Sequence, residues 1–245
     1  MNFFHARGVP AALIALLFAI LARVMGSVSD GGAIVGIVVA FLLMVTTGFV
    51  GFLPLLTLFA LTVFATRWGQ RRKERLGVAE RSGGRSASQV LANLSVAAAC
   101  AVPVLWFPEF NDLLLTGAMA ALAEAAADTV SSEIGQASAS RAYLIVGLRS
   151  VPIGTNGAIS LAGTLSGIVA AFIIAWVSAG LGIVAGSAVP VIGLAGSAGM
   201  MFDSLLGATW ENAGLLGNDA VNFVSTVFAA DLALLIGLAM ERFPR

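Results

Sequence analysis

The sequence is poor in the residues on which most soluble enzymes and disulfide-stabilised proteins rely. Only 11% of its 245 residues are charged, and it contains one histidine and one cysteine. A soluble domain of this length carries about a quarter charged residues. His5 stands alone near the N-terminus, which argues against histidine catalysis, and Cys100 stands alone in an apolar run, which excludes a disulfide framework. The formal net charge of zero gives no basic field that favours nucleic acid as a partner.

Long apolar runs are what the chain has in excess. Hydrophobic residues make up 59% of it, and runs of about 20 recur along its whole length. This pattern predicts an all-α, polytopic integral membrane helical bundle that forms a single domain over residues 1–245. We expect about eight spans, with seven to nine compatible with the turn signals between them: 9–25, 30–47, 51–67, 89–107, 112–130, 157–178, 182–208 and 219–240. No small-x-small cleavage site follows the first run, so we expect a retained first helix rather than a signal peptide.

The basic residues predict the orientation of the bundle. The polar loop 67–88 holds seven of the thirteen lysines and arginines, so the positive-inside rule predicts that it is cytoplasmic. Counting eight spans outward from this loop places Arg23, Arg141 and Arg149 on the same side and both termini on the other. We therefore expect an integral protein of a bacterial inner membrane.

The polar residues of the spans gather at their cytoplasmic ends. They open or close the second, fourth, fifth, sixth, seventh and eighth spans, and they are Asp30, Arg85, Gln89, Asp128, Glu133, Thr155, Asn156, Asp203, Asn218, Asp219 and Asn222. The opposite ends offer few polar side chains. This asymmetry predicts one polar site that opens to the cytoplasm.

The stretch "AAADTVSSEIGQ", residues 125–136, places carboxylates in an apolar run, where they are costly and usually functional. Glu124 and Asp128 share one helical face, whereas Glu133 points about 140° away from Asp128 on an ideal helix. Asp128 and Glu133 could share a cation only if the helix loosens between Ser131 and Gly135. The functional interpretation is a Mg²⁺ site that neutralises phosphate charge. The alternative is a helix end whose acids are solvated or paired with a nearby arginine.

The stretch "VPIGTNGAIS", residues 151–160, has the pattern of a helix start. Pro152 and Gly154 break the chain, and Thr155 or Asn156 could cap the helix that follows. Free N–H groups at such a start form an anion site, although an ordinary capped helix explains the pattern as well. Within the same span, the small residues at 163–167 indicate helix packing.

Arg85, Gln89 and Asn93 recur every four residues into the fourth span. On a helix they would form a ladder that descends from the basic loop into the bundle, and the arginine could clamp a phosphate bidentately. The alternative is that the loop only sets orientation and attracts anionic lipid headgroups. Asp231, in the middle of the last span, fits neither group and is interpreted as a paired structural acid or as a sign of misplaced span boundaries.

The candidate set combines acids, amides, hydroxyls and basic residues. Phosphoryl transfer needs chiefly cations, positioning and metal-binding carboxylates, so it matches this inventory better than serine hydrolysis or redox chemistry. A membrane-embedded site that opens to the cytoplasm indicates a lipid acceptor and a soluble phosphate donor.

Six stretches, which span most of the chain, carry a family resemblance. They are "ATRWG" (65–69) followed by "RK" (72–73), "GGRSASQVLAN" (83–93), "DTVSSEIG" (128–135), "GTNGAISLAGT" (154–164), "DSLLGAT" (203–209) and "NDAVNF" (218–223). In order and spacing the chain resembles the transmembrane family of the phytyl-phosphate kinase of tocopherol synthesis, with its bacterial and archaeal relatives. The resemblance implies transfer of the γ-phosphate of a nucleoside triphosphate, with CTP favoured, to a phytyl- or geranylgeranyl-type monophosphate.

Carried onto this sequence, the resemblance implies roles for individual residues. Asp128 and Glu133 become the catalytic and Mg²⁺-binding carboxylates, with Asp203 and Asp219 as further metal or nucleotide ligands. The candidates for phosphate or nucleotide binding are Lys73, Arg85, Gln89, Asn93, Gly154, Thr155, Asn156, Gly157, Ser160, Asn218 and Asn222. Relatives carry an acid at position 156, so Asn156 is not expected to be an essential metal ligand.

Two alternatives stay open at this stage. A membrane transporter or lipid flippase would use intramembrane acids for ion or proton coupling, but it should show midplane polar residues and internal repeats, and only Asp231 approaches the midplane. A kinase of the free isoprenoid alcohol would use the same parts without a site for the acceptor phosphate. The glycine-rich spans also permit a homo-oligomer.

Overall fold

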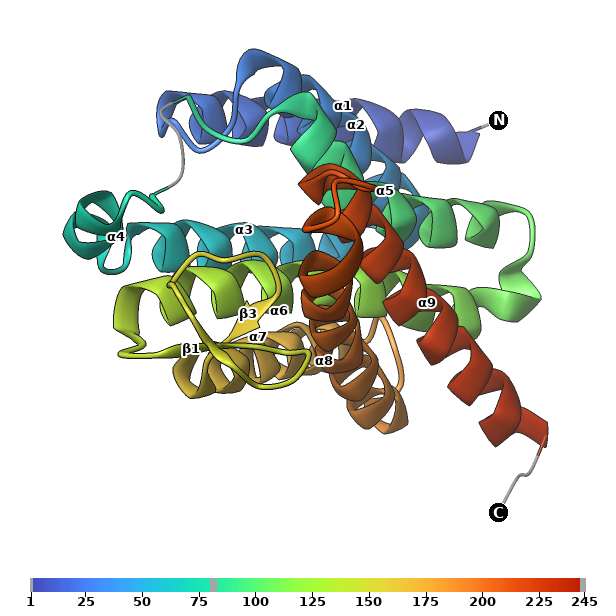
Figure 1. Ribbon diagram of the computed structural model, residues 1–245. Coiled ribbons are helices and arrows are strands. Elements are labelled where there is room, and N and C mark those ends of the chain that lie inside the picture. The colour runs from blue at the N-terminus through green and yellow to red at the C-terminus, as the bar shows by residue number, and fades with distance from the viewer. Residues whose placement is uncertain (1, 80–82, 243–245) are drawn as a thin grey trace.

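The computed structural model describes residues 2–79 and 83–242, so Arg81 of the basic loop and Arg245 lie outside the described residues. The helices are α1 (Asn2–Val24), α2 (Asp30–Thr47), α3 (Phe52–Arg67), α4 (Gln70–Leu76), α5 (Ala87–Ala101), α6 (Asn111–Ser138), α7 (Leu161–Gly180), α8 (Val189–Leu206) and α9 (Asn218–Arg242), and the strands are β1 (Ala142–Leu144), β2 (Ser150–Val151) and β3 (Ala158–Ile159) (Figure 1). Short 3₁₀ helices occupy Phe49–Gly51, Val102–Leu105, Pro108–Phe110 and Gly186–Ala188, and a π-helical turn occupies Gly207–Glu211.

The predicted integral membrane helical bundle is confirmed. Seven helical segments of the described chain are long and apolar enough to cross a membrane, and residues 8–24 of α1 form a shorter apolar helix. The seven segments are 30–47, 49–67, 87–105, 108–138, 161–180, 186–211 and 218–240. They match seven of the expected spans in order, and α1 takes the place of the first.

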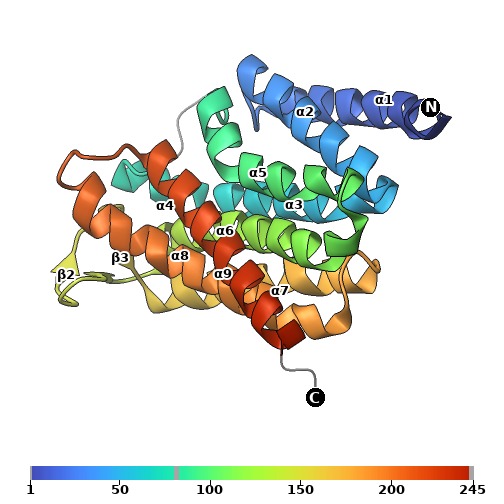
Figure 2. The same cartoon turned by 90° about the vertical axis from the view of Figure 1, so that its right-hand side faces the viewer.

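Helix α6 is the centre of the bundle. It contacts α3, α5, α7, α8 and α9, which surround it in both views (Figures 1 and 2). Small side chains allow these close approaches, because a Cβ on Gly167 of α7 would lie 2.8 Å from the Ala127 carbonyl oxygen of α6, and one on Gly196 of α8 would lie 2.8 Å from the Ala123 Cβ. The packing role predicted for the small residues of α7 is therefore confirmed.

The segment between α6 and α7 differs from the prediction. Residues 142–159 form a small antiparallel sheet in the order β2-β1-β3, with Tyr143 opposite both Ser150 and Ile159. The helix start is therefore later than expected, because Ser160, and neither Thr155 nor Asn156, caps α7 by accepting a hydrogen bond from the Gly163 N–H at 3.1 Å.

Turns explain why this segment is not helical. Gly154 and Gly157 adopt positive φ angles of 87° and 72°, and the Thr155 hydroxyl donates to the Pro152 carbonyl oxygen at 2.8 Å. The Thr155 side chain is thereby committed to the turn rather than to a helix cap.

The turn between α1 and α2, the basic loop and the sheet meet at one end of the bundle. The Ser29 N–H donates to the Arg85 carbonyl oxygen at 2.9 Å, and the Arg85 N–H donates to the Ser27 carbonyl oxygen at 3.1 Å. A Cβ on Gly154 would lie 2.4 Å from a methyl carbon of Val78, so the sheet turn packs against the loop. In Figure 2 the sheet and α4 lie together on the left, away from the N-terminus of α1.

Candidate active site

A cavity of about 390 Å³ opens at this end of the bundle and is lined mostly by polar side chains. It is enclosed by the start of α5, the second half of α6, the turn before β3, the end of α8 with the π-helical turn, and the start of α9. The predicted site residues that line it are Arg85, Gln89, Asn93, Asp128, Glu133, Gly154, Thr155, Asn156, Gly157, Ser160, Asp203, Asn218 and Asn222. Segments that are distant in sequence thus meet in one polar site, as their common location at the span ends predicted.

Asp128 on α6 and Asp203 on α8 line the same cavity, and their carboxyl groups are close enough to interact electrostatically. A side chain of α9 positions Asp203, because the Ser225 hydroxyl donates a hydrogen bond to Asp203 Oδ2 at 3.2 Å. With its amide oriented to satisfy its neighbours, Asn222 also donates to Asp203 Oδ2 at 3.2 Å and accepts from Asn93 Nδ2 at 3.3 Å. Two acids so close together need a cation between them, either a proton or a metal ion.

Arg85 supplies positive charge to this acidic cavity, and its guanidinium interacts electrostatically with Asp128. The predicted ladder on α5 is only partly correct, since Ser86 is the N-cap and Arg85 precedes the helix. Gln89 completes a capping box by accepting from the Ser86 N–H at 2.8 Å, so its carbonyl oxygen stabilises the helix start. Asn93 lies one turn further along α5 and lines the cavity.

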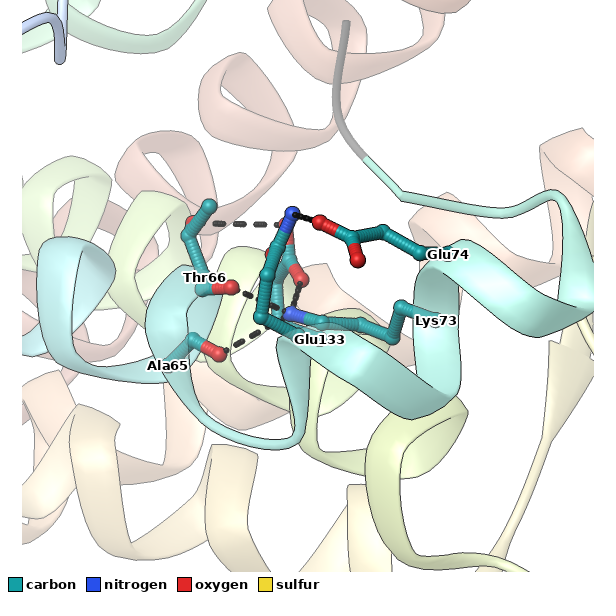
Figure 3. Close-up of polar contacts among 6 residues, drawn as sticks. Ala65, Thr66, Lys73, Glu74 and Glu133 are labelled. Carbon is teal, nitrogen blue, oxygen red and sulfur yellow. Dashed lines mark hydrogen bonds and ion pairs between the residues drawn. The ribbon is translucent and has the colours of Figure 1, made fainter.

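The predicted pairing of Asp128 with Glu133 is wrong, because α6 is continuous through Ser138 and does not loosen between them. Glu133 instead forms an ion pair with Lys73 at α4 and accepts a 3.3 Å hydrogen bond from the Thr66 hydroxyl (Figure 3). Lys73 is fully buried and also donates to the carbonyl oxygens of Ala65 and Thr66, at 3.2 and 2.5 Å. Lys73 does not line the cavity, so the structure contradicts its predicted role as a phosphate ligand.

Two other acids lie away from the cavity. Asp219, predicted as a metal ligand, is absent from the cavity wall and occupies the first turn of α9, where a carboxylate is favoured by the helix dipole. Asp231 is exposed in the middle of α9 and forms no ion pair with any residue that the structure describes. Among the described residues Asp231 is thus not the paired structural acid that was expected, and its own span, 218–240, has nearly the expected bounds.

The predicted site residues did not include two acids of this region, Glu124 and Glu211. Glu211 lines the cavity at the end of the π-helical turn, a feature that often marks functional sites and that no residue pattern in the sequence revealed. Glu124 lies near the middle of α6 with 1% of its surface exposed, and neither carboxyl oxygen has a hydrogen-bond partner among the described residues. It lies one turn before Asp128 on the helical face that the spacing of four residues had already assigned to both acids, although Glu124 was not chosen as a site residue.

The donor set fits a magnesium ion that shares its ligands with a phosphate. Within the described ranges, no three histidine, cysteine or acidic side chains are close enough together to hold a metal ion unaided. Mg²⁺ is usually bound by one or two carboxylates together with substrate phosphates and water, rather than by an all-protein cage. Asp128 and Asp203 supply such a pair.

Comparison with known proteins agrees with the resemblance seen in the motifs. Residues 13–230 match the family described as "Integral membrane protein DUF92". An uncharacterized membrane protein of Synechocystis sp. is 35% identical over 190 residues, which cover 76% of this chain and 74% of that protein. An uncharacterized membrane protein of Methanocaldococcus jannaschii is 32% identical over 225 residues, which cover 91% of this chain and 92% of that protein.

A plant relative is similar to a comparable degree. Protein VTE6, chloroplastic, of Arabidopsis thaliana is 34% identical over 212 residues, which cover 82% of this chain but only 64% of the length of VTE6. No solved structure matches this chain significantly. The family match extends from α1 to the middle of α9 and includes every element that lines the cavity. The chain therefore belongs to the DUF92 family of integral membrane proteins.

Proposed function

We propose that this protein is an isoprenoid-phosphate kinase, which transfers the γ-phosphate of a nucleoside triphosphate to a prenyl monophosphate and releases the prenyl diphosphate. The observation that carries the proposal is the Asp128–Asp203 carboxyl pair, which lines a polar cavity together with Arg85 at one end of a membrane bundle. The sequence motifs shared with the phytyl-phosphate kinase family favour CTP as donor and a phytyl- or geranylgeranyl-type acceptor.

The chemistry requires little of the protein beyond positioning and charge. An oxygen of the acceptor phosphate attacks the γ-phosphorus, the bond between that phosphorus and the β–γ bridging oxygen breaks, and the nucleoside diphosphate leaves with the bridging oxygen. Because the attacking oxygen already carries negative charge, no strong general base is needed, which agrees with a cavity that has no histidine in its wall.

Each part of the cavity has a role in this scheme. Arg85 binds acceptor or donor phosphate through its planar guanidinium. Asn93, Asn218 and Asn222 donate amide N–H groups to phosphate or ribose oxygens. Asp128 and Asp203 would hold Mg²⁺, which would screen the charge of the phosphates.

We further propose that the cavity faces the cytoplasm of a bacterial cell. The cavity opens beside the basic loop, and the positive-inside rule assigns such a loop to the cytoplasmic side. A nucleoside triphosphate is available on that side. Labelling of a Ser150→Cys variant in intact cells with a membrane-impermeant maleimide tests this orientation, because the cysteine should react only after the membrane is opened.

A transfer assay tests the reaction itself. Purified protein in detergent is incubated with γ-labelled CTP or ATP, Mg²⁺ and either geranylgeranyl phosphate, phytyl phosphate or the free alcohols. Label should appear in a prenyl diphosphate, and chelation of divalent cations should abolish the transfer. Absence of transfer to every monophosphate by folded protein would exclude the proposal, and transfer to an alcohol alone would identify an alcohol kinase instead.

Glu124 favours a second candidate function, an ion-coupled transporter. Its carboxyl group lies deep in the bundle without a hydrogen-bond partner among the described residues, as a proton-coupling acid of a transporter does. A proteoliposome assay separates the two, because a transporter should move protons or ions with its substrate in the absence of any nucleotide.

A further inference from the structure

A second depression adjoins the polar cavity and has the opposite chemistry. It is lined by α1, α2, α3, α5 and α6, almost entirely with apolar side chains, and we call it the apolar groove. Its wall consists of Phe18, Ala19, Ala22, Ser27, Val28, Gly32, Ala33, Gly36, Leu55, Leu58, Phe59, Thr62, Arg85, Gln89, Val90, Asn93, Leu94, Ala125 and Thr129.

The apolar groove lies directly beside the polar cavity. Arg85, Gln89, Asn93 and Thr129 line both, so their side chains form the boundary between the two. A molecule that lies across this boundary would place a polar head beside Arg85 and a hydrocarbon chain among the helices.

The groove descends from this boundary into the bundle. Along α3 its wall runs from Thr62 to Leu55, which is about 10 Å of helix. Phe18 of α1 and Phe59 of α3 pack edge to face in its wall, with ring centroids 4.9 Å apart. The groove has a volume of about 80 Å³, which suits the beginning of a chain whose remainder lies in the membrane.

Two glycines of α2 give the groove its shape. A Cβ on Gly32 would lie 2.4 Å from the Arg85 carbonyl oxygen, so only glycine lets α2 approach the boundary. Gly36 lies one turn deeper, and a Cβ there would meet nothing within 4 Å. A Cβ at Gly36 therefore has open space around it, and because Gly36 lines the groove, a larger side chain there would take up space in the groove.

We propose that the apolar groove binds the proximal isoprene units of the acceptor, whose phosphate lies at Arg85. This inference rests on the proposed function, and it adds where the lipid binds and which residues select it. Charge complementarity between the phosphate and Arg85, together with the four residues that line both the groove and the polar cavity, favours a single-chain lipid phosphate as the occupant. Gly36 is then a specificity-determining residue.

The test compares Gly36→Phe with a matched control. Gly180→Phe is the control, because Gly180 ends α7, lies outside the groove and also has nothing within 4 Å of its Cβ position. Equilibrium binding is measured for geranylgeranyl phosphate, for dimethylallyl phosphate, whose chain is a single isoprene unit, and for CTP. Gly36→Phe should weaken geranylgeranyl phosphate binding by at least about tenfold, whereas dimethylallyl phosphate and CTP change by less than about threefold. Gly180→Phe should change none of the three.

The outcomes separate this inference from the proposed function. Unchanged geranylgeranyl phosphate affinity in Gly36→Phe would overturn the groove assignment, and so would loss of co-purified phospholipid with unchanged prenyl-phosphate affinity. If the two variants show the predicted changes in binding but the wild-type protein transfers no phosphate, the kinase proposal is refuted and the groove assignment stands. Retained CTP binding in Gly36→Phe shows that the variant is folded.

Discussion

The second half of α6 carries two acidic regions that differ in how their charge is neutralised. Glu133 is paired with the fully buried Lys73, which also has two backbone carbonyl oxygens as acceptors. Asp128 lies close to another acid, Asp203, and both line the cavity. In the first region one lysine neutralises one acid, whereas in the second two acids and Arg85 line a cavity that a cationic or phosphate-bound ligand can enter. Two neighbouring acids in a cavity are therefore better functional candidates than an acid that the protein has paired one to one.

Asp128→Asn should have the largest effect on activity. The substitution keeps the size of the side chain but removes a charge from the proposed Mg²⁺ pair, so transfer should fall by at least about 100-fold. Initial rates of transfer from γ-labelled CTP measure it. The thermal unfolding midpoint should change little, because Asp128 lies close to a second acid, Asp203, and loss of one negative charge relieves their mutual repulsion.

Asp231→Asn is the matched control for this variant. Asp231 is an acid of a membrane-spanning helix that is exposed and outside the cavity, so its substitution should leave transfer unchanged. Equal losses in both variants, or loss of folding in Asp128→Asn, would contradict the distinction drawn between the two regions of α6.

Lys73→Met should have the largest effect on stability. It leaves the Glu133 carboxylate without its cation, and breaking one side of a buried ion pair costs about 3 kcal/mol or more in the free energy of unfolding. The double variant Lys73→Met/Glu133→Gln removes both charges and should recover much of that loss. Chemical unfolding of the two variants measures the difference, and equal stability of single and double variants would show that the pair does not hold α4 against α6.

Gly157→Ala tests how tightly the turn before β3 is fixed on the cavity wall. A Cβ there would lie 2.2 Å from the Ala208 backbone nitrogen, whereas a Cβ on Gly147 would meet nothing within 4 Å, although both glycines have positive φ angles of 72° and 77°. Gly147→Ala should cost about 1 kcal/mol for its backbone conformation alone. Gly157→Ala should cost roughly 1–3 kcal/mol more, because the clash adds to it. Equal costs in an unfolding experiment would show that the turn moves away freely.

Glu124→Gln should have the smallest effect if the protein is a kinase. The carboxyl group lies outside the cavity wall, so transfer should stay within about threefold of wild type, a change of less than about 1 kcal/mol in activation free energy. An ion-coupled transporter would instead lose coupled transport with this variant. Measurement of transfer and of proton uptake on the same preparation distinguishes the two functions.

The composition of the sequence was enough to predict the bundle and the end at which its polar residues meet. Apolar runs of span length report helices directly, and Arg85, Asp128, Asp203 and Asn222 all mark the same ends of their helices. The position of a residue along a span depends only on the nearby sequence, so it is the same in the folded protein as in the prediction. This is why most of the predicted site residues line one cavity.

Contacts between residues that are distant in the sequence could not be predicted in the same way. Lys73 belongs to a loop rich in basic residues, and nothing in the local pattern showed that it folds back onto Glu133, 60 residues away. The start of α7 was misplaced because Thr155 and Asn156 are as suitable for caps as Ser160. The turns at Gly154 and Gly157 and the pairing of Tyr143 with Ile159 decide against them. The π-helical turn at Glu211 likewise depends on packing rather than on residue type.

The most direct test of the proposed function follows the labelled phosphate itself. Purified wild-type protein and the Asp203→Asn variant are incubated with γ-labelled CTP, Mg²⁺ and geranylgeranyl phosphate, and the lipid products are separated. Wild type should place the label in the terminal phosphate of geranylgeranyl diphosphate, and Asp203→Asn should form little or none. Label that stays in the nucleotide or in free phosphate with folded wild-type protein would contradict phosphoryl transfer at this cavity.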